Sequence, residues 1–290
     1  MCLRRRGFSI VEVLVTLGVL SMLMGFLLPA VQRTREAARR TQCRNNLKQL
    51  GIALHNYDSI HRAFPPGSVP AAWSFKAMLL PQLGDAVGFS QIDFSNNIDP
   101  LSGWYSCGPE SLRLAQVSVE PDRVSRPVFY CPSDPSAGSG LPGWRKGNYL
   151  GVSGDGVGDV TTAWEHRPGV PLPPARKGTL FFCSHVSVAD LHDGTSSTIV
   201  VGERGVQGYA ADLCAGFGTS ERFSWLATGG GLRECIRGNP ENDLHFWSHH
   251  SHGTHFLFGD GHVGFLSNSI SNEIYWSLST RAASETIAEF

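Results

Sequence analysis

Residues 7–31 read GFSIVEVLVTLGVLSMLMGFLLPAV and directly follow three arginines at positions 4–6. Within 8–31 the only ionisable side chain is that of Glu12. As a helix rising ~1.5 Å per residue, this stretch extends about 36 Å, enough to cross a hydrocarbon core of ~30 Å. A secretory signal peptide usually has a shorter apolar region, ~7–15 residues, that ends in a small-residue cleavage site. Because bulky residues continue here to Leu28, the stretch predicts a transmembrane helix.

Glu12 is the unusual residue of this span. A carboxylate inside a membrane costs roughly 2.5–3.5 kcal/mol on insertion scales and needs a partner, yet the apolar run contains no cationic side chain. If the chain is cut between Gly7 and Phe8, the new α-amino group lies four residues before Glu12, on the same helical face. We expect that amine to pair with Glu12 of its own helix or of a neighbouring subunit. The alternative is a plain membrane anchor with a stray glutamate.

These residues carry a family resemblance. A short basic leader ending in Gly7, then Phe8, an apolar run with Glu12 five positions after the glycine, and a late Pro29 resemble the N-terminal cleavage/methylation motif of type IV prepilins and type II secretion pseudopilins. In that family a membrane-embedded prepilin peptidase cuts after the glycine and methylates the new amine, and the glutamate assists filament assembly. The resemblance implies that Gly7 is the cleavage residue, Phe8 the methylated terminus and Glu12 the assembly residue. Residues 1–7 are then the leader.

The same resemblance implies a topology and partners. Basic residues flank both ends of the span, so the positive-inside rule alone does not orient it. Prepilins cross the inner (cytoplasmic) membrane once, with the N-terminus cytoplasmic and the head periplasmic or extracellular. The implied partners are prepilin peptidase, other pilin or pseudopilin subunits, the inner-membrane assembly platform and membrane lipid.

After the transmembrane and assembly helix at 8–31, residues 32–60 have the pattern of an amphipathic helix. Apolar residues recur at alternating spacings of four and three, at Cys43, Leu47, Leu50, Leu54 and Tyr57. No strong breaker separates the two segments, because Pro29 kinks a helix rather than necessarily ending it. We predict one helix from Ser9 to Tyr57, with its leucine stripe packed on a globular head of residues 61–290.

The composition of the head describes a loop-rich domain of short strands, since the chain has 33 glycines, 17 prolines and only 17% charged residues. Strands are predicted at 128–131, 148–152 and 198–201, and a hairpin over Thr254–Leu266 turns at residues 259–261. A tail helix is predicted from Ser271 to Arg281. The expected fold class is α+β, a long N-terminal helix packed on a head with an antiparallel β-sheet, as in pseudopilins.

Net charge and cysteine content narrow the partners and the compartment. A net charge of −1 gives no case for nucleic acid, which requires a basic stripe. Seven cysteines are present and Cys2 lies in the leader, so an even number remains in a head placed where disulfides persist. The candidate disulfide cysteines are Cys43, Cys131, Cys214 and Cys235. Their pairing stays open, as does the alternative that several are buried free thiols.

A wider resemblance covers nearly the whole chain. It rests on the strings RTREAARRTQCRNNLKQLGIALHNY, FPPGS, FYCPSDP, GNYLG, DGTSSTIVVGE and FLFGDGHVGFL. These are similar to a prepilin-like family abundant in planctomycete bacteria, whose region after the helix is catalogued as domain of unknown function 1559. That family shows a C-terminal signature of a histidine, nine residues and then Asp-Gly, which His250 and Asp260-Gly261 match. The resemblance implies a pseudopilin-like architecture without a known reaction.

Two segments are candidates for metal binding. Residues 153–160, SGDGVGDV, place Asp155 and Asp159 among glycines, where they are candidate calcium ligands, although the spacing is not that of an EF-hand and a glycine turn is the simpler interpretation. In an extended segment His250 and His252 project to one face, which suits zinc or copper. A polar loop held by hydrogen bonds is the alternative. Glu203 is expected to make a buried polar contact.

The sequence lacks the common catalytic motifs: it has no G-x-S-x-G elbow, no H-E-x-x-H helix and no phosphate-binding loop. We therefore expect that the protein is not an enzyme and that it binds no cofactor other than the candidate calcium. The leading hypothesis is a structural, pseudopilin-like subunit of a type II secretion or type IV pilus-like filament. The alternative is a membrane-anchored extracytoplasmic module that binds a metal or a glycan and forms no filament.

Overall fold

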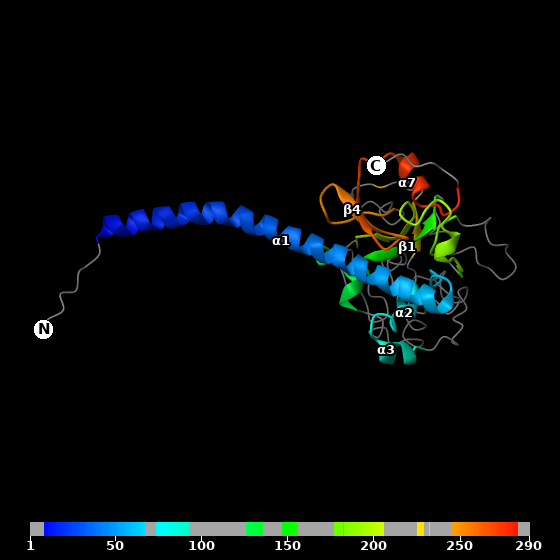
Figure 1. The fold of residues 1–290 in the computed structure, drawn as a ribbon. Helices are drawn as coiled ribbons and strands as arrows, with labels where there is room; N and C mark the ends of the chain where they lie inside the picture. Colours follow the sequence, from blue (N-terminus) through cyan, green and yellow to red (C-terminus); the bar gives the residue numbers. More distant parts are fainter. Residues whose placement is uncertain are drawn as a thin grey trace, which may run out of the picture.

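The computed structural model describes residues 9–67, 74–92, 126–135, 147–155, 177–181, 183–205, 225–228, 232 and 245–283. Its elements in chain order are α1 (Ile10–His61), α2 (Phe75–Met78), α3 (Ala86–Ser90), η2 (Pro127–Phe129), β1 (Tyr149–Gly154), η4 (Val188–Asp190), β2 (Ile199–Glu203), β3 (Trp225–Ala227), β4 (Gly253–Phe258), β5 (Val263–Ser267) and α7 (Asn272–Ser277). Figure 1 shows α1 as a rod whose first half extends away from the head and whose second half lies along it. The predicted α+β arrangement is confirmed.

Helix α1 is continuous over 52 residues and includes Pro29 in its interior. It ends at His61, and Arg62 takes the left-handed conformation (φ 60°) with its backbone N–H donating to the carbonyl of Asp58. The helix thus continues four residues beyond the predicted end at Tyr57. The helix ends four residues before Pro65, and a proline disfavours helical backbone in the residue before it.

The second half of α1 packs on the head through the predicted apolar stripe. Cys43, Leu47 and Leu50 are fully buried and Leu54 is nearly so, and the helix contacts η2, β4 and β5. Gly51 lies against β4, where an added Cβ would be only 2.9 Å from a methyl carbon of Leu257. The absence of a side chain there lets the helix lie directly on the sheet.

The head is organised around one five-stranded sheet in the order β3-β1-β2-β4-β5. The pairs β1–β2, β2–β4 and β4–β5 are antiparallel, as predicted, whereas β3 joins the edge of β1 in parallel. The predicted hairpin is confirmed as β4 and β5, whose register runs from Gly253 opposite Ser267 to Leu257 opposite Val263.

Neighbouring residues of a strand point to opposite faces of the sheet, and each face packs against its own hydrophobic core. Tyr149, Val201 and Leu257 join a core with α1, α2 and the loop around Leu180. The alternate positions join a second core with α7, which contains Leu150, Val152, Ile199, Phe256, Phe258 and Tyr275. The sheet is therefore a central layer with α1 on one face and α7 on the other (Figure 1).

Two local predictions differ from the structure. The segment 128–131 was predicted as a strand, and this is wrong: Pro127–Phe129 form the 3-10 helix η2 with Pro127 at its start. Proline suits the first position of a helix and removes a donor that a strand needs. The tail helix is also shorter than predicted, because α7 covers only Asn272–Ser277.

Candidate functional site

The first half of α1 presents apolar side chains to its surroundings on every side. In the most apolar 18-residue window of the helix, none of the residues is buried, and the helix is long and apolar enough to cross a membrane. Leu17, Met24 and Phe26 are each more than half exposed. An apolar surface of this extent needs lipid or other helices around it.

The N-terminus of this helix is capped by Ser9 and Glu12. The Ser9 hydroxyl accepts a hydrogen bond from the backbone N–H of Val11, and a carboxylate oxygen of Glu12 accepts one from the N–H of Ser9 at 2.9 Å. This capping box orients the carboxylate toward the start of the helix, where the helix dipole favours negative charge. Gly7 and Phe8, the predicted processing residues, lie outside the described residues.

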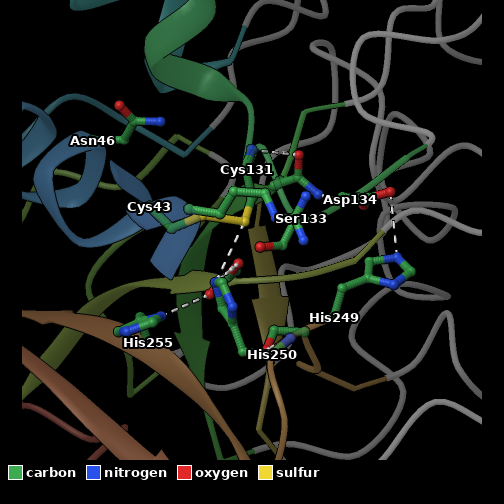
Figure 2. Close-up of a disulfide and its surroundings, with 12 residues drawn as sticks. Cys43, Asn46, Cys131, Ser133, Asp134, His249, His250 and His255 are labelled. Atoms are coloured by element: carbon green, nitrogen blue, oxygen red, sulfur yellow. Dashed lines mark hydrogen bonds and ion pairs between the residues drawn. A yellow bond between two sulfur atoms is a disulfide. The ribbon is translucent and has the colours of Figure 1, made fainter. Parts of the chain in front are cut away.

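A second, buried group of polar residues lies where α1 meets the head. A disulfide joins Cys43 of α1 to Cys131, which follows η2. Figure 2 shows His250 next to this disulfide, with His255 on one side and Asp134 and His249 on the other. Cys43 and Cys131 are two of the four candidate disulfide cysteines; the other two, Cys214 and Cys235, lie outside the described residues. Cys183 is an exposed free thiol.

His250 is the centre of this group, and its side chain is only 1% exposed. Its Nδ1 lies 2.9 Å from a carboxylate oxygen of Glu36 on α1. Its Nε2 lies 3.4 Å from Oε1 of Glu203 and 3.5 Å from Sγ of Cys131. The other oxygen of Glu203 lies 3.1 Å from Nδ1 of His255. The buried polar contact expected for Glu203 is therefore with two histidines.

Two neighbouring groups hold the cysteine-bearing loop and α1 in place. Asn148 accepts a hydrogen bond from the backbone N–H of Cys131 at 2.9 Å and donates one to Asp134 at 2.6 Å. Tyr149 donates to the backbone carbonyl of Cys43 at 3.4 Å. Burial, together with the nearby charge of Glu203, raises the pKa of the Tyr149 hydroxyl well above its ordinary value, so the phenol stays a donor.

Glu36 is partly exposed, and its pKa is shifted in the opposite direction from that of Tyr149. Burial by itself raises the pKa of its carboxyl, but hydrogen bonds from His250, Arg39 and Ser133 outweigh burial and lower the pKa below the ordinary value. The charged form of Glu36 is thus the one that ties α1 to His250.

The residues of the predicted C-terminal signature occupy the two ends of β4. His250 lies before the strand and contacts Glu36. Asp260 and Gly261 follow it, where Asp260 accepts a hydrogen bond from the N–H of His262 and the Gly261 carbonyl accepts one from Lys48 of α1 at 2.8 Å. Residues 36 and 48 are about 18 Å apart along a helix. The signature residues on the two sides of β4 therefore attach the head to α1 at two separate points.

The structure describes two of the three other candidate metal ligands, Asp155 and His252. Asp155 lies 2.9 Å from Nζ of Lys177, and Asp159 lies outside the described residues. His252 is exposed and takes a left-handed backbone conformation (φ 69°), so it does not share a face with the buried His250. The structure pairs His250 instead with Glu36, Glu203 and His255, which sequence reasoning did not connect.

Two family matches bear on these two regions. Residues 32–273 match the family described as protein of unknown function (DUF1559), and residues 2–28 match the prokaryotic N-terminal methylation motif. The chain belongs to the DUF1559 family. It also carries a prepilin-type methylation motif, the mark of a pilin-type processed protein. No curated protein and no solved structure matches the chain.

Four of the six strings that carry the DUF1559 resemblance, together with the signature histidine, meet at the buried group. Cys43 belongs to the helix string, Cys131 and Asp134 to FYCPSDP, Asn148 and Tyr149 to GNYLG, Glu203 to DGTSSTIVVGE, and His250 to the signature. These four strings are distant from one another in sequence, yet each contributes a side chain to the contacts around the disulfide. These strings were thus the sequence signal for the buried group. Separate strings that share one family resemblance are explained together if their residues meet in space.

Proposed function

We propose that this DUF1559 protein is a structural, pseudopilin-like subunit of a type II secretion or type IV pilus-like filament. Prepilin peptidase removes residues 1–7, and the mature chain, beginning at Phe8, assembles from the inner membrane through α1. In this topology the N-terminus is cytoplasmic and the head is periplasmic or extracellular. The head supplies contacts to neighbouring subunits, and the role is not catalytic.

The observation that carries the proposal is the first half of α1. It is apolar and unburied over a full membrane span, and it begins with a glutamate that caps its own helix start. In a plain anchor the Glu12 carboxylate would make only its cap contact with Ser9, although its burial in lipid is unfavourable. An amine at residue 8 of the same or a neighbouring subunit gives Glu12 a partner.

The test compares two variants that both disturb the N-terminal cap. Glu12→Ala removes the charge and the cap contact, whereas Ser9→Ala removes the serine cap contact and keeps the charge. We expect a mature chain that starts at methylated Phe8 in both, by intact mass. Subunit cross-linking and filament yield should be lost in Glu12→Ala and retained in Ser9→Ala.

Two results oppose the proposal. An uncut chain starting at Met1 in its native membrane would make α1 a simple anchor. A Glu12→Ala chain that cross-links and assembles as well as the unaltered chain would remove the assembly role and favour the anchored binding module.

A further inference from the structure

Besides the disulfide, three ionisable side chains surround His250: those of Glu36, Glu203 and His255. An imidazole whose Nδ1–H donates to Glu36 has a lone pair on Nε2. That nitrogen faces Oε1 of Glu203 at 3.4 Å and Sγ of Cys131 at 3.5 Å, and all three are electron-pair donors. Buried donors that face one another are stable only with a cation between them, either a proton or a metal ion.

The four side chains around this point form a compact set of metal-ligating atoms. One atom each from Cys43, Cys131, Glu203 and His250 lie within 4.8 Å of one another, and all four residues are buried. Zinc takes four ligands tetrahedrally at about 2.0–2.3 Å, which places neighbouring ligand atoms roughly 3.5 Å apart. Only small side-chain movements separate the two arrangements once the sulfurs are free.

The residues behind these ligands are those that zinc sites commonly have. The far ring nitrogen of His250 is held by the Glu36 carboxylate, and the far oxygen of Glu203 is held by His255. Such outer contacts fix the tautomer and the orientation of the ligand. Two thiolates balance the charge of Zn²⁺, and His255 lies beside the carboxylate that remains.

We propose that reduction of the disulfide converts this group into a zinc site whose ligands are the thiolates of Cys43 and Cys131, Nε2 of His250 and a carboxylate oxygen of Glu203. A dithiol reductant supplies two electrons and two protons, breaks the S–S bond and becomes a disulfide itself. Zn²⁺ then displaces the two thiol protons and forms two Zn–S bonds. The disulfide and the zinc ion are alternative links between α1 and the head, one for oxidising and one for reducing surroundings.

Cobalt binding to the full mature chain in detergent tests this site, because Co²⁺ replaces zinc and reports its ligands by absorption. The chain is reduced with a phosphine, desalted without oxygen and titrated with Co²⁺. We expect one cobalt ion per chain with thiolate charge-transfer and tetrahedral d–d bands, which zinc abolishes. The same chain with its disulfide intact is the control and should show neither band.

Variants locate the ion. His250→Ala should abolish the bands, whereas His252→Ala, which changes an exposed histidine two residues away, should keep them. Glu36→Gln keeps all four ligands but weakens the outer contact, so cobalt affinity should fall by about 10–100-fold. It serves as the second variant if His250→Ala fails to give the near-UV circular dichroism of the folded head.

Several results would overturn the zinc site. One is a reduced chain that binds no cobalt. Another is a set of cobalt absorption bands that persists unchanged in His250→Ala, and another is a cobalt affinity that is equal in Glu36→Gln and the unaltered chain. Equal binding before and after reduction would likewise exclude the two sulfurs as ligands.

Discussion

Opening the Cys43–Cys131 disulfide should destabilise the head strongly, because the bond closes a long loop. The two cysteines are 88 residues apart. In the chain-entropy model a cross-link stabilises by about T(2.1 + 1.5R ln n) cal/mol, which for this loop is about 4.6 kcal/mol at 25 °C. For a head of this size, a change of 1 kcal/mol moves the melting temperature by about 2–4 °C. The expected fall is therefore about 9–18 °C.

Thermal unfolding of the full chain in detergent measures this effect, with near-UV circular dichroism to follow buried aromatic residues such as Trp247. The reduced chain is compared with the oxidised chain in the presence of a chelator, so that zinc cannot replace the bond. A Cys43→Ala/Cys131→Ala double variant should melt near the reduced chain. Cys183→Ser, which removes the exposed thiol, should melt with the oxidised chain.

The reasoning is refuted if reduction lowers the melting temperature by less than about 4 °C, since that corresponds to 1–2 kcal/mol and not to closure of a long loop. It is also refuted if Cys183→Ser has the same effect as the double variant. In that case the loss would come from thiol chemistry elsewhere and not from the link between α1 and the head.

Two further predictions concern the same junction and the sheet beneath it. Because the pKa of Glu36 is lowered in the folded chain, its contribution to stability is present above the ordinary value of 4.5 and is lost as the pH falls through the lower folded value. Urea unfolding at a series of pH values should show this loss of stability. In Glu36→Gln this part of the pH dependence should be absent. Gly202→Ala should lower stability by about 1–3 kcal/mol, because the new Cβ would lie 2.6 Å from the rings of Phe246 and Phe256. Gly18→Ala, where a Cβ meets no atom within 4 Å, is its control in the same urea titration; equal midpoints for the two variants would contradict the packing argument.

The sequence predicted the elements whose signals are local. The span of α1 follows from an uninterrupted apolar run, and its second half follows from the spacing of leucines that face the head. The β4–β5 hairpin follows from two apolar segments around Gly259-Asp260-Gly261. Each of these patterns repeats within a few residues, so neighbouring positions carry the information.

The buried group was not predictable in the same way, because its members are distant in sequence. Glu36 and His250 are 214 residues apart, and Glu203 and His255 are 52 apart. Periodicity gives the face of an element and not its partner across the fold. The pattern of separate polar strings indicated important positions, whereas only the packing of α1 on the sheet showed that they meet.

The positions of these contacts along α1 connect the head to the membrane segment. Glu36 lies five residues beyond Val31, about 8 Å past the end of the predicted span, and Lys48 lies about 18 Å further along the helix. The disulfide at Cys43 lies between them. Three attachments at different heights prevent the head from turning about a continuous helix. In a filament built by packing first halves of α1, the direction of every head is therefore set by Glu36, Cys43 and Lys48, and a change at the buried group should alter the surface of the filament without altering membrane insertion.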